Sequence, residues 1–276
     1  MTAITRKDLI ENLQTSLKSQ VPIIGAGVGT GLVAKAAAAG GADFLVVYCT
    51  SVARHRGFPT SIIGDPNTMM LDLLPDVIRA AGAVPVIAGI QATDPARNIE
   101  NDLLPQVRDM GCAGVINYPS MGLYGREYIG GPTGYTDGLE IEHSMLQKAR
   151  DENLFAITYS YRPEEAKFFA DAADMIVAHA GWTSGGLAGN TTAVGHETAA
   201  QVVEDHYTAA TSVTSDIFVL AHGGPYARPN DTKELYRRTR AMGFVGASSI
   251  ERIPVEEAVS QVVSDFKNHQ LTTVRN

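Results

Sequence analysis

Residues 217–249 read IFVLAHGGPYARPNDTKELYRRTRAMGFVGASS, and this stretch decides the fold. A short apolar run at 217–222 is followed by a helical pattern at 232–242 and by a second apolar run at 244–247. A buried strand, a helix and another buried strand in this order form a unit whose two strands lie parallel. The stretch therefore predicts an α/β protein with a parallel sheet.

The same pairing recurs along the whole chain. We expect strands at the apolar runs 21–25, 44–48, 84–88, 114–117, 155–159, 175–179, 217–222 and 244–247. We expect helices between and after them at 31–39, 69–81, 96–110, 141–152, 164–172, 196–211, 232–242 and 255–267. Eight alternations in a chain of 276 residues match a (β/α)8 TIM barrel, which needs roughly 250 residues. A doubly wound open sheet is the alternative, but it usually has six strands.

We predict that residues 1–276 form a single TIM-barrel domain in which residues before 21 are a leading N-terminal helix. The net charge of −8 opposes binding to nucleic acid or anionic lipid. No apolar run is long enough to span a membrane, and the two cysteines suggest neither a disulfide framework nor a thiolate metal site. These features predict a cytoplasmic protein whose partner is a small molecule.

Polar residues gather at the predicted strand ends, which in a barrel converge on one mouth. His179 and His222 end neighbouring strands and are candidates for general acid–base catalysis. They could instead bind a metal, but the spacing shows no third ligand. Four further strand ends carry hydrogen-bonding side chains that suit a carbonyl, enolate or carboxylate, namely Tyr48, Gln91, Asn117 and Tyr159.

The last two turns have small residues that would let backbone amides approach an anion, namely Gly223, Gly224, Ser248 and Ser249. Tight turns with no ligand are the alternative. Glu251 and Arg252 follow the eighth predicted strand. They are expected to be a carboxylate and its ion-pair partner at the mouth, with an ion pair that only starts a helix as the alternative.

Two loops after the strands carry further candidates. Trp182 lies in the glycine-rich segment 181–190, which has the composition of a lid. Residues 54–57, RHRG, are expected to be a solvated loop, with an anion contact as the alternative.

Three motifs carry a resemblance to a known family. The chain resembles the phosphoenolpyruvate hydrolase-like TIM-barrel family over nearly its whole length. The resemblance is carried by GAG at 25–27 through Tyr48, by HGGP at 222–225 and by GASSIERIP at 246–254. That family is also similar to the C-terminal domain of a plant tobamovirus-resistance protein. The resemblance implies kinship with the phosphoenolpyruvate mutase and isocitrate lyase group, which holds 2-oxo acid enolates on Mg²⁺ through acidic residues at strand ends.

The sequence departs from that group at the metal ligands. After the third predicted strand the group has a pattern similar to Asp-x-Asp-Thr-Gly, whereas this chain has GIQAT at 89–93. After the fourth predicted strand the group has Glu-Asp, whereas this chain has Asn117-Tyr118. A Mg²⁺ site normally uses one or two carboxylates. We therefore predict no metal ligands and leave the cofactor open, with Mg²⁺ as the one that the resemblance implies.

These observations predict a hydrolase or lyase that cleaves a C–C, C–P or C–O bond of a small anionic oxo acid through an enolate-like intermediate. His179 and His222 would exchange protons, Tyr159 and Asn117 would hold the oxyanion, and Glu251 joins the catalytic set. The substrate-binding set is Tyr48, Gln91, Gly223, Gly224, Ser248, Ser249, Arg252 and Trp182. A homo-oligomer is expected. The alternative is a non-catalytic barrel that binds a ligand or a protein.

Overall fold

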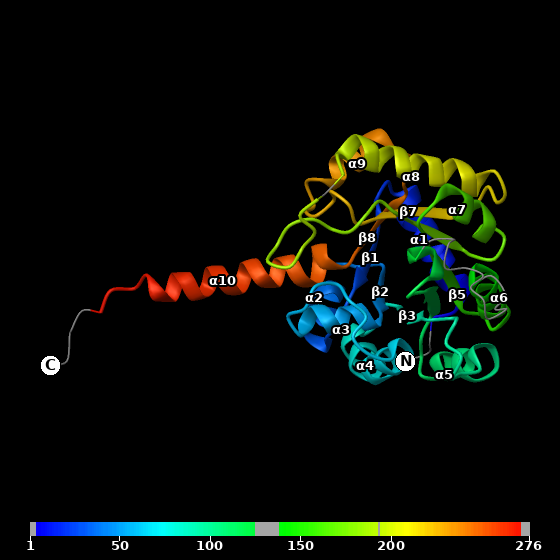
Figure 1. Cartoon of the computed structure of the whole chain (residues 1–276), viewed down its shortest axis with the longest axis horizontal. Helices are drawn as coiled ribbons and strands as arrows, with labels where there is room; N and C mark the ends of the chain where they lie inside the picture. The colour runs from blue at the N-terminus through cyan, green and yellow to red at the C-terminus, as the bar shows by residue number, and fades with distance from the viewer. Residues whose placement is uncertain (1–3, 125–137, 193, 272–276) are drawn as a thin grey trace.

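The computed structural model describes residues 4–124, 138–192 and 194–271, so most of the glycine-rich segment 120–138 lies outside the described residues. Eight parallel strands close into a barrel in chain order, from β1 to β8, as the sequence predicts (Figure 1). The last strand pairs with the first, with Ile24 opposite Phe244. The strands are β1 (Ile23–Gly27), β2 (Phe44–Val47), β3 (Val86–Ile90), β4 (Gly114–Asn117), β5 (Phe155–Ser160), β6 (Met175–His179), β7 (Phe218–His222) and β8 (Gly243–Gly246).

Helices surround the barrel, and α1 covers its amino end. Leu9 and Leu13 of α1 are buried in the same cluster as the interior strand residues Ile23 and Phe44. The helices are α1 (Arg6–Lys18), α2 (Gly31–Ala39), α3 (Cys49–His55), α4 (Pro66–Ala81), α5 (Leu104–Asp109), α6 (Gly138–Asp151), α7 (Pro163–Phe169), α8 (His196–Thr211), α9 (Thr232–Arg238) and α10 (Ile253–Lys267).

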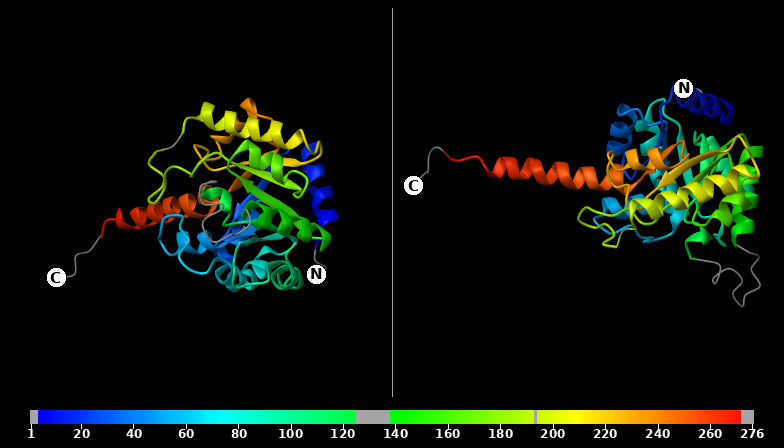
Figure 2. Two further views of the ribbon diagram at one scale, coloured as in Figure 1. Left: turned by 45° about the vertical axis from the view of Figure 1, so that its right-hand side comes forward. Right: turned by 90° about the horizontal axis from the view of Figure 1, so that it is seen from above.

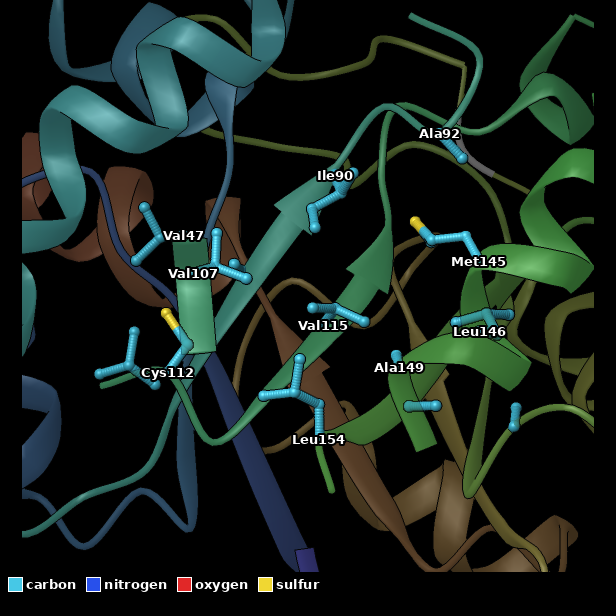
Figure 3. Close-up of a cluster of buried hydrophobic side chains, with 14 of the residues drawn as sticks. Val47, Ile90, Ala92, Val107, Cys112, Val115, Met145, Leu146, Ala149 and Leu154 are labelled. Carbon is cyan, nitrogen blue, oxygen red and sulfur yellow. The ribbon is translucent and has the colours of Figure 1, made fainter. Parts of the chain in front are cut away.

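Apolar side chains fill both the barrel interior and the layer between barrel and helices. Figure 3 shows the outer layer where strands β3 and β4 meet α5 and α6: Val115 points toward Leu146 and Ala149, and Ile90 and Val107 belong to the same cluster. Strand residues therefore alternate between an interior and an exterior core, which fixes which side chains can reach the mouth.

Three element predictions are corrected. The predicted helix 96–110 is a π-helical turn (Ile99–Leu103) followed by the short helix α5. The solvated loop expected at 54–57 is wrong for its first half, because Arg54 and His55 end helix α3 and Arg54 is buried, whereas Arg56 and Gly57 are exposed. Strands β1 and β3 begin and end two residues later than expected.

Helix α10 leaves the body of the molecule, and both views of Figure 2 show it extending away from the barrel. Between Pro254 and Lys267, Glu256 is partly buried and every other residue is exposed. Five apolar side chains are exposed along it, namely Val255, Val259, Val262, Val263 and Phe266. No helix in the described part of the chain is long and apolar enough to cross a membrane.

Candidate active site

Aromatic rings form a connected row across the carboxyl end of the barrel. Tyr48, directly after β2, lies 4.9 Å from Tyr118, directly after β4, and Tyr118 lies 5.4 Å from Tyr159 of β5, as measured between ring centroids. The Tyr159 ring is 5.0 Å from that of His222, which in turn is 5.0 Å from that of His179. The barrel thus brings together four of the predicted site residues, and it adds Tyr118.

Close packing in this row depends on two glycines. A Cβ atom at Gly27 would lie 2.6 Å from the Tyr48 hydroxyl, and one at Gly89 would lie 2.6 Å from the Tyr48 Cβ atom. Real carbon atoms do not approach so closely, so the ends of β1 and β3 must be glycine for Tyr48 to point across the mouth. The GAG motif at 25–27 therefore has a steric role at the site.

The neighbours of His222 determine which of its nitrogens carries the proton. Nδ1 lies 2.7 Å from the backbone oxygen of Val245, and a carbonyl oxygen only accepts hydrogen bonds. Nδ1 therefore donates, and Nε2 is left with a free lone pair. Burial lowers the pKa of His222 to about 4, so this imidazole is a neutral base near pH 7.

His179 has the opposite arrangement. Its Nδ1 accepts a hydrogen bond from the backbone N–H of Gly181 at 3.2 Å, so Nε2 carries the proton. Burial, followed by the charge of His222, lowers the pKa of His179 well below its usual value. The register places the two histidines side by side on β6 and β7. One imidazole therefore presents a base and the other a hydrogen-bond donor.

A buried ion pair lies beside the tyrosines. Arg54 of α3 donates from Nε to Glu251 Oε1 at 2.7 Å and also pairs with it through Nη2, and His55 Nε2 lies 3.2 Å from Glu251 Oε2. Burial is the largest single effect on Glu251 and raises its pKa, but the charges and hydrogen bonds of Arg54 and His55 together outweigh it, so the pKa is lowered. The expected pair of Glu251 with Arg252 is wrong: Arg252 binds Glu256, 3.0 Å away.

Two cavities adjoin at the mouth. The inner one has a free volume of about 20 Å³, and among its lining residues are the tyrosines, both histidines and Arg54. A polar space of this size holds about one water molecule. The outer cavity has about 260 Å³ and is lined by Pro59, Ala188, Gly189, Asn190 and Arg252. Four residues line both, namely Thr60, Trp182, Thr183 and Ser248.

Two predicted residues have structural partners instead of facing these cavities. Asn117 donates to Glu142 at 2.6 Å and accepts from the backbone N–H of Tyr159 at 2.7 Å, so its amide is already engaged. The backbone N–H of Gln91 donates to the Asn67 side chain, and the backbone oxygen of Gln91 accepts from it. Gln91 is not among the residues that line the two cavities. Asn117 therefore positions β5 rather than an oxyanion.

The expected anion cradle is occupied by the protein itself. The backbone N–H of Gly224 donates to the Gly181 oxygen at 2.7 Å, and a side chain at Gly223 would clash with that same carbonyl. The Ser249 hydroxyl is buried and lies near Gly246 instead of lining a cavity. Of the four small residues in these turns, Ser248 is the one that lines both cavities.

Two hydrogen bonds hold the segment around Trp182 against the start of α10. Arg252 Nη2 donates to the Gly185 oxygen at 3.0 Å, and the backbone N–H of Leu187 donates to Glu256 at 2.8 Å. Trp182 is 42% exposed, and its ring is 5.5 Å from that of His179. The predicted site set lacks Arg54, Tyr118, Thr60 and Thr183. Three of them had a signal in the sequence: Arg54 belongs to the RHRG stretch, for which an anion contact was the alternative, Tyr118 directly follows a predicted strand end, and Thr183 lies in the predicted lid segment.

The three quoted motifs all contribute to this mouth, and a family model described as phosphoenolpyruvate hydrolase-like matches residues 8–269. The chain belongs to the phosphoenolpyruvate hydrolase-like family. Curated relatives include the ToMV susceptible protein tm-1(GCR26) and the ToMV resistance protein Tm-1(GCR237) of Solanum lycopersicum, each 37% identical over 94% and 95% of this chain. The chain spans only 35% and 36% of their lengths.

Solved structures similar to this family member are far more distant in sequence. A phosphonopyruvate hydrolase in complex with oxalate and Mg²⁺ has a TM-score of 0.62 at 15% identity, covering 94% of this chain and 86% of its own. An oxaloacetate acetylhydrolase in complex with its product oxalate has a TM-score of 0.61 at 16% identity, covering 99% and 90%. At this identity the likeness shows the fold.

The phosphonopyruvate hydrolase structure contains Mg²⁺, the ion that the sequence resemblance also implies, and the described side chains at this mouth do not fit it. Neither cavity is lined by an aspartate or glutamate in the described ranges, and Glu251 is held by Arg54. Within the same ranges no three His, Cys, Asp or Glu side chains are grouped as ligands for a metal ion. A Mg²⁺ ion prefers carboxylate oxygen. The described residues at the mouth of this phosphoenolpyruvate hydrolase-like barrel therefore do not offer the donor set that such an ion needs.

Proposed function

We propose that this chain is a hydrolase that uses His222 to activate water against an anionic oxo acid. The observation that carries this proposal is the hydrogen bonding of the two histidines, from which opposite tautomers follow, beside a chamber with room for one water molecule. His222 Nε2 is the base, and the low pKa of His222 keeps it unprotonated near neutral pH. The other imidazole that lines the chamber, His179, has its acceptor nitrogen occupied by the Gly181 N–H.

The geometry supports a simple sequence of steps. The water oxygen forms a bond to the carbonyl carbon of the substrate while His222 Nε2 takes a water proton. The carbonyl oxygen becomes an oxyanion, which accepts hydrogen bonds from His179 Nε2–H and from the Tyr159 hydroxyl. Burial raises the pKa of Tyr159 well above its usual value, so this hydroxyl stays protonated. When the oxyanion collapses, the departing enolate takes the proton from His222, and the site returns to its starting state.

Two variants and one product analysis test this proposal. The probe is oxaloacetate, incubated with the protein and followed by mass spectrometry of the acids released. Hydrolysis by these steps releases oxalate and acetate, whereas decarboxylation releases pyruvate. His222→Asn and His179→Asn should each lower kcat about 10²- to 10⁴-fold and leave Tm nearly unchanged. Undiminished turnover in both variants would contradict the assignment.

A non-catalytic binding barrel is the second candidate. The narrow inner chamber favours it, because no substrate carbon fits there without movement of the Trp182 segment. Two longer curated relatives are named for susceptibility and resistance to ToMV and not for a reaction. No turnover of any oxo acid, together with tight binding of one, would favour this candidate.

We also propose that the chain forms a homo-oligomer through α10. Val255, Val259, Val262, Val263 and Phe266 follow the spacing of one helix face and are exposed. Because α10 does not return to cover β8 and β1, the barrel itself lacks a helix there (Figure 1). The apolar, alanine-rich face of α2, with Leu32, Ala36 and Ala39 exposed, suits the valines of a second copy.

We place the protein in the cytoplasm. Cys49 and Cys112 are both free and buried, which agrees with a reducing compartment.

A further inference from the structure

Glu142 is a buried carboxylate that the proposed hydrolysis does not use. It lies on α6 and is fully buried, and it is not among the residues that line the two cavities. Its Oε2 atom accepts from Asn117 Nδ2 at 2.6 Å and from the Ser120 hydroxyl at 2.8 Å. Its Oε1 atom accepts from the backbone N–H of Met121 at 2.5 Å. One carboxylate thus ties the segment that directly follows β4 to the start of α6.

These hydrogen bonds lead from Glu142 to two rings of the aromatic row. Tyr118 lies between Asn117 and Ser120 in the sequence, so the two side chains bound to the carboxylate flank it. Asn117 extends the contact to β5, because its Oδ1 atom accepts from the backbone N–H of Tyr159 at 2.7 Å. The placement of both tyrosines therefore depends on a carboxylate that lies behind the mouth.

Glu142 has no cationic partner among the described residues, unlike the neighbouring carboxylate Glu165. Glu165 of α7 is also buried, but Arg162 Nη1 pairs with it at 2.6 Å. Burial, with a smaller contribution from the charge of Glu165, raises the pKa of Glu142 to about 7 against the three hydrogen bonds, which lower it. The charge that holds the segment after β4 is therefore one that changes near neutral pH.

The elements packed against α6 bring few further titratable groups toward this carboxylate. Strand β4 and the 3₁₀ turn Met121–Leu123 contain none. The hydroxyl of Tyr161, which follows β5, keeps its proton because burial raises its pKa well above the usual value. Two ionisable side chains nearby have partners of their own, namely His143 with Asp171 and Glu100 with Ser144.

A proton on Glu142 disturbs all three hydrogen bonds. The Nδ2 group of Asn117 and the backbone N–H of Met121 only donate, so neither can accept from the new O–H. The Ser120 hydroxyl alone can turn round, and its oxygen already accepts from the backbone N–H of Gly122 at 3.1 Å. Hydrogen bonds to a charged acceptor are roughly twice as strong as those between neutral groups, so loss of the charge weakens the contacts that remain.

We propose that Glu142 is a positioning residue whose charged carboxylate holds Tyr118 and Tyr159 in the aromatic row from behind the mouth. Proton uptake by Glu142 loosens these contacts and lets both rings shift relative to His222. The inference concerns the geometry of the mouth and needs no assumption about the reaction. If the proposed hydrolysis holds, it also makes the oxyanion contact of Tyr159 depend on the charge of Glu142.

NMR titration tests the proposal in the wild-type chain. With ¹³C at the glutamate side-chain carboxyls, one carboxyl should titrate with a midpoint near pH 7, whereas ordinary glutamates titrate at about pH 4.3. The ¹⁵N ring signals of His222 should move with the same midpoint, although this ring gains its own proton only near pH 4. Glu142→Gln should remove that carboxyl signal and abolish the movement of His222 near pH 7.

Glu140→Gln is the control, because Glu140 lies two residues earlier on the same helix and is exposed. It should leave both titrations unchanged. Ser120→Ala removes one donor that favours the charged carboxylate, so both midpoints should rise together.

The wild-type and Ser120→Ala titrations decide the question even if Glu142→Gln does not fold. A wild-type chain in which every glutamate titrates below about pH 5.5 would overturn the proposal, as would a movement of His222 near pH 7 that survives Glu142→Gln. Neither signal depends on turnover. A protein that does not hydrolyse oxaloacetate would therefore contradict the proposed function and leave the role of Glu142 in place.

Discussion

Single backbone atoms set the chemistry of the two histidines. The positions of His179 and His222 follow from the sequence, because each ends a strand and adjacent strands meet at the mouth. Their tautomers do not, because they depend on the Val245 carbonyl of β8 and the Gly181 amide after β6. A sequence pattern specifies which side chains converge, but not which backbone atom faces each nitrogen.

The burial of Arg54 was equally beyond sequence reasoning. Its partner Glu251 is 197 residues away along the chain, and a lone RHRG stretch is ordinarily solvated. The pair forms because α3 turns back across the mouth immediately after Tyr48, where Glu251 follows β8. Such long-range pairing can be predicted only once the barrel register is known.

Removing one member of this pair should be costly. Glu251→Gln leaves the buried Arg54 charge without its counter-charge, so we expect the free energy of unfolding to fall by about 3 kcal/mol. Chemical denaturation monitored by circular dichroism measures this. Glu204→Gln, which removes a surface partner of Arg240, should cost well under about 1 kcal/mol. Equal effects of the two substitutions would contradict the ascribed role of the buried pair.

At the scale of elements, the sequence predicts which strands and helices are present better than it predicts where each begins and ends. Eight apolar runs predicted eight strands. The helix at 96–110 was overextended because its periodicity hides a π-helical turn before Leu104 and Pro105. Helix α3 was missed because CTSVARH has few apolar residues to show a helical period.

Helix α10 carries a prediction about assembly. Val259→Asp with Val263→Asp places charge within the apolar stripe, so we expect the oligomer to dissociate to monomer. Gln261→Glu with Ser264→Asp adds the same charge on the opposite face and should leave the oligomer intact. Light scattering after size-exclusion chromatography measures both. A wild-type chain that is monomeric at micromolar concentration would exclude this interface.

At the scale of the molecule, the buried histidines link folding to pH. The unfolded chain protonates His222 near pH 6.5, whereas the folded chain does so only near pH 4. The neutral folded form is therefore favoured above pH 6.5, and that stabilisation is lost as the pH falls from 6.5 to 4. The lowered pKa of His179 acts in the same direction.

We therefore expect the free energy of unfolding to decrease between pH 6.5 and pH 4.5, with about 2 kcal/mol of the decrease due to His222. His222→Asn should show a correspondingly smaller decrease across the same interval. Urea unfolding of both proteins at the two pH values measures the difference. Identical decreases would show that His222 titrates alike in the folded and unfolded chains.

The central claim is that the closed barrel holds two neutral imidazoles of opposite tautomer at one mouth. Long-range ¹H–¹⁵N NMR of the ¹⁵N-histidine-labelled protein at pH 6.5 tests it without a substrate, with the two signals assigned from the asparagine variants. The account predicts a proton on Nδ1 and a bare Nε2 for His222, and a proton on Nε2 for His179. Two imidazolium rings, or the same tautomer at both positions, would contradict it.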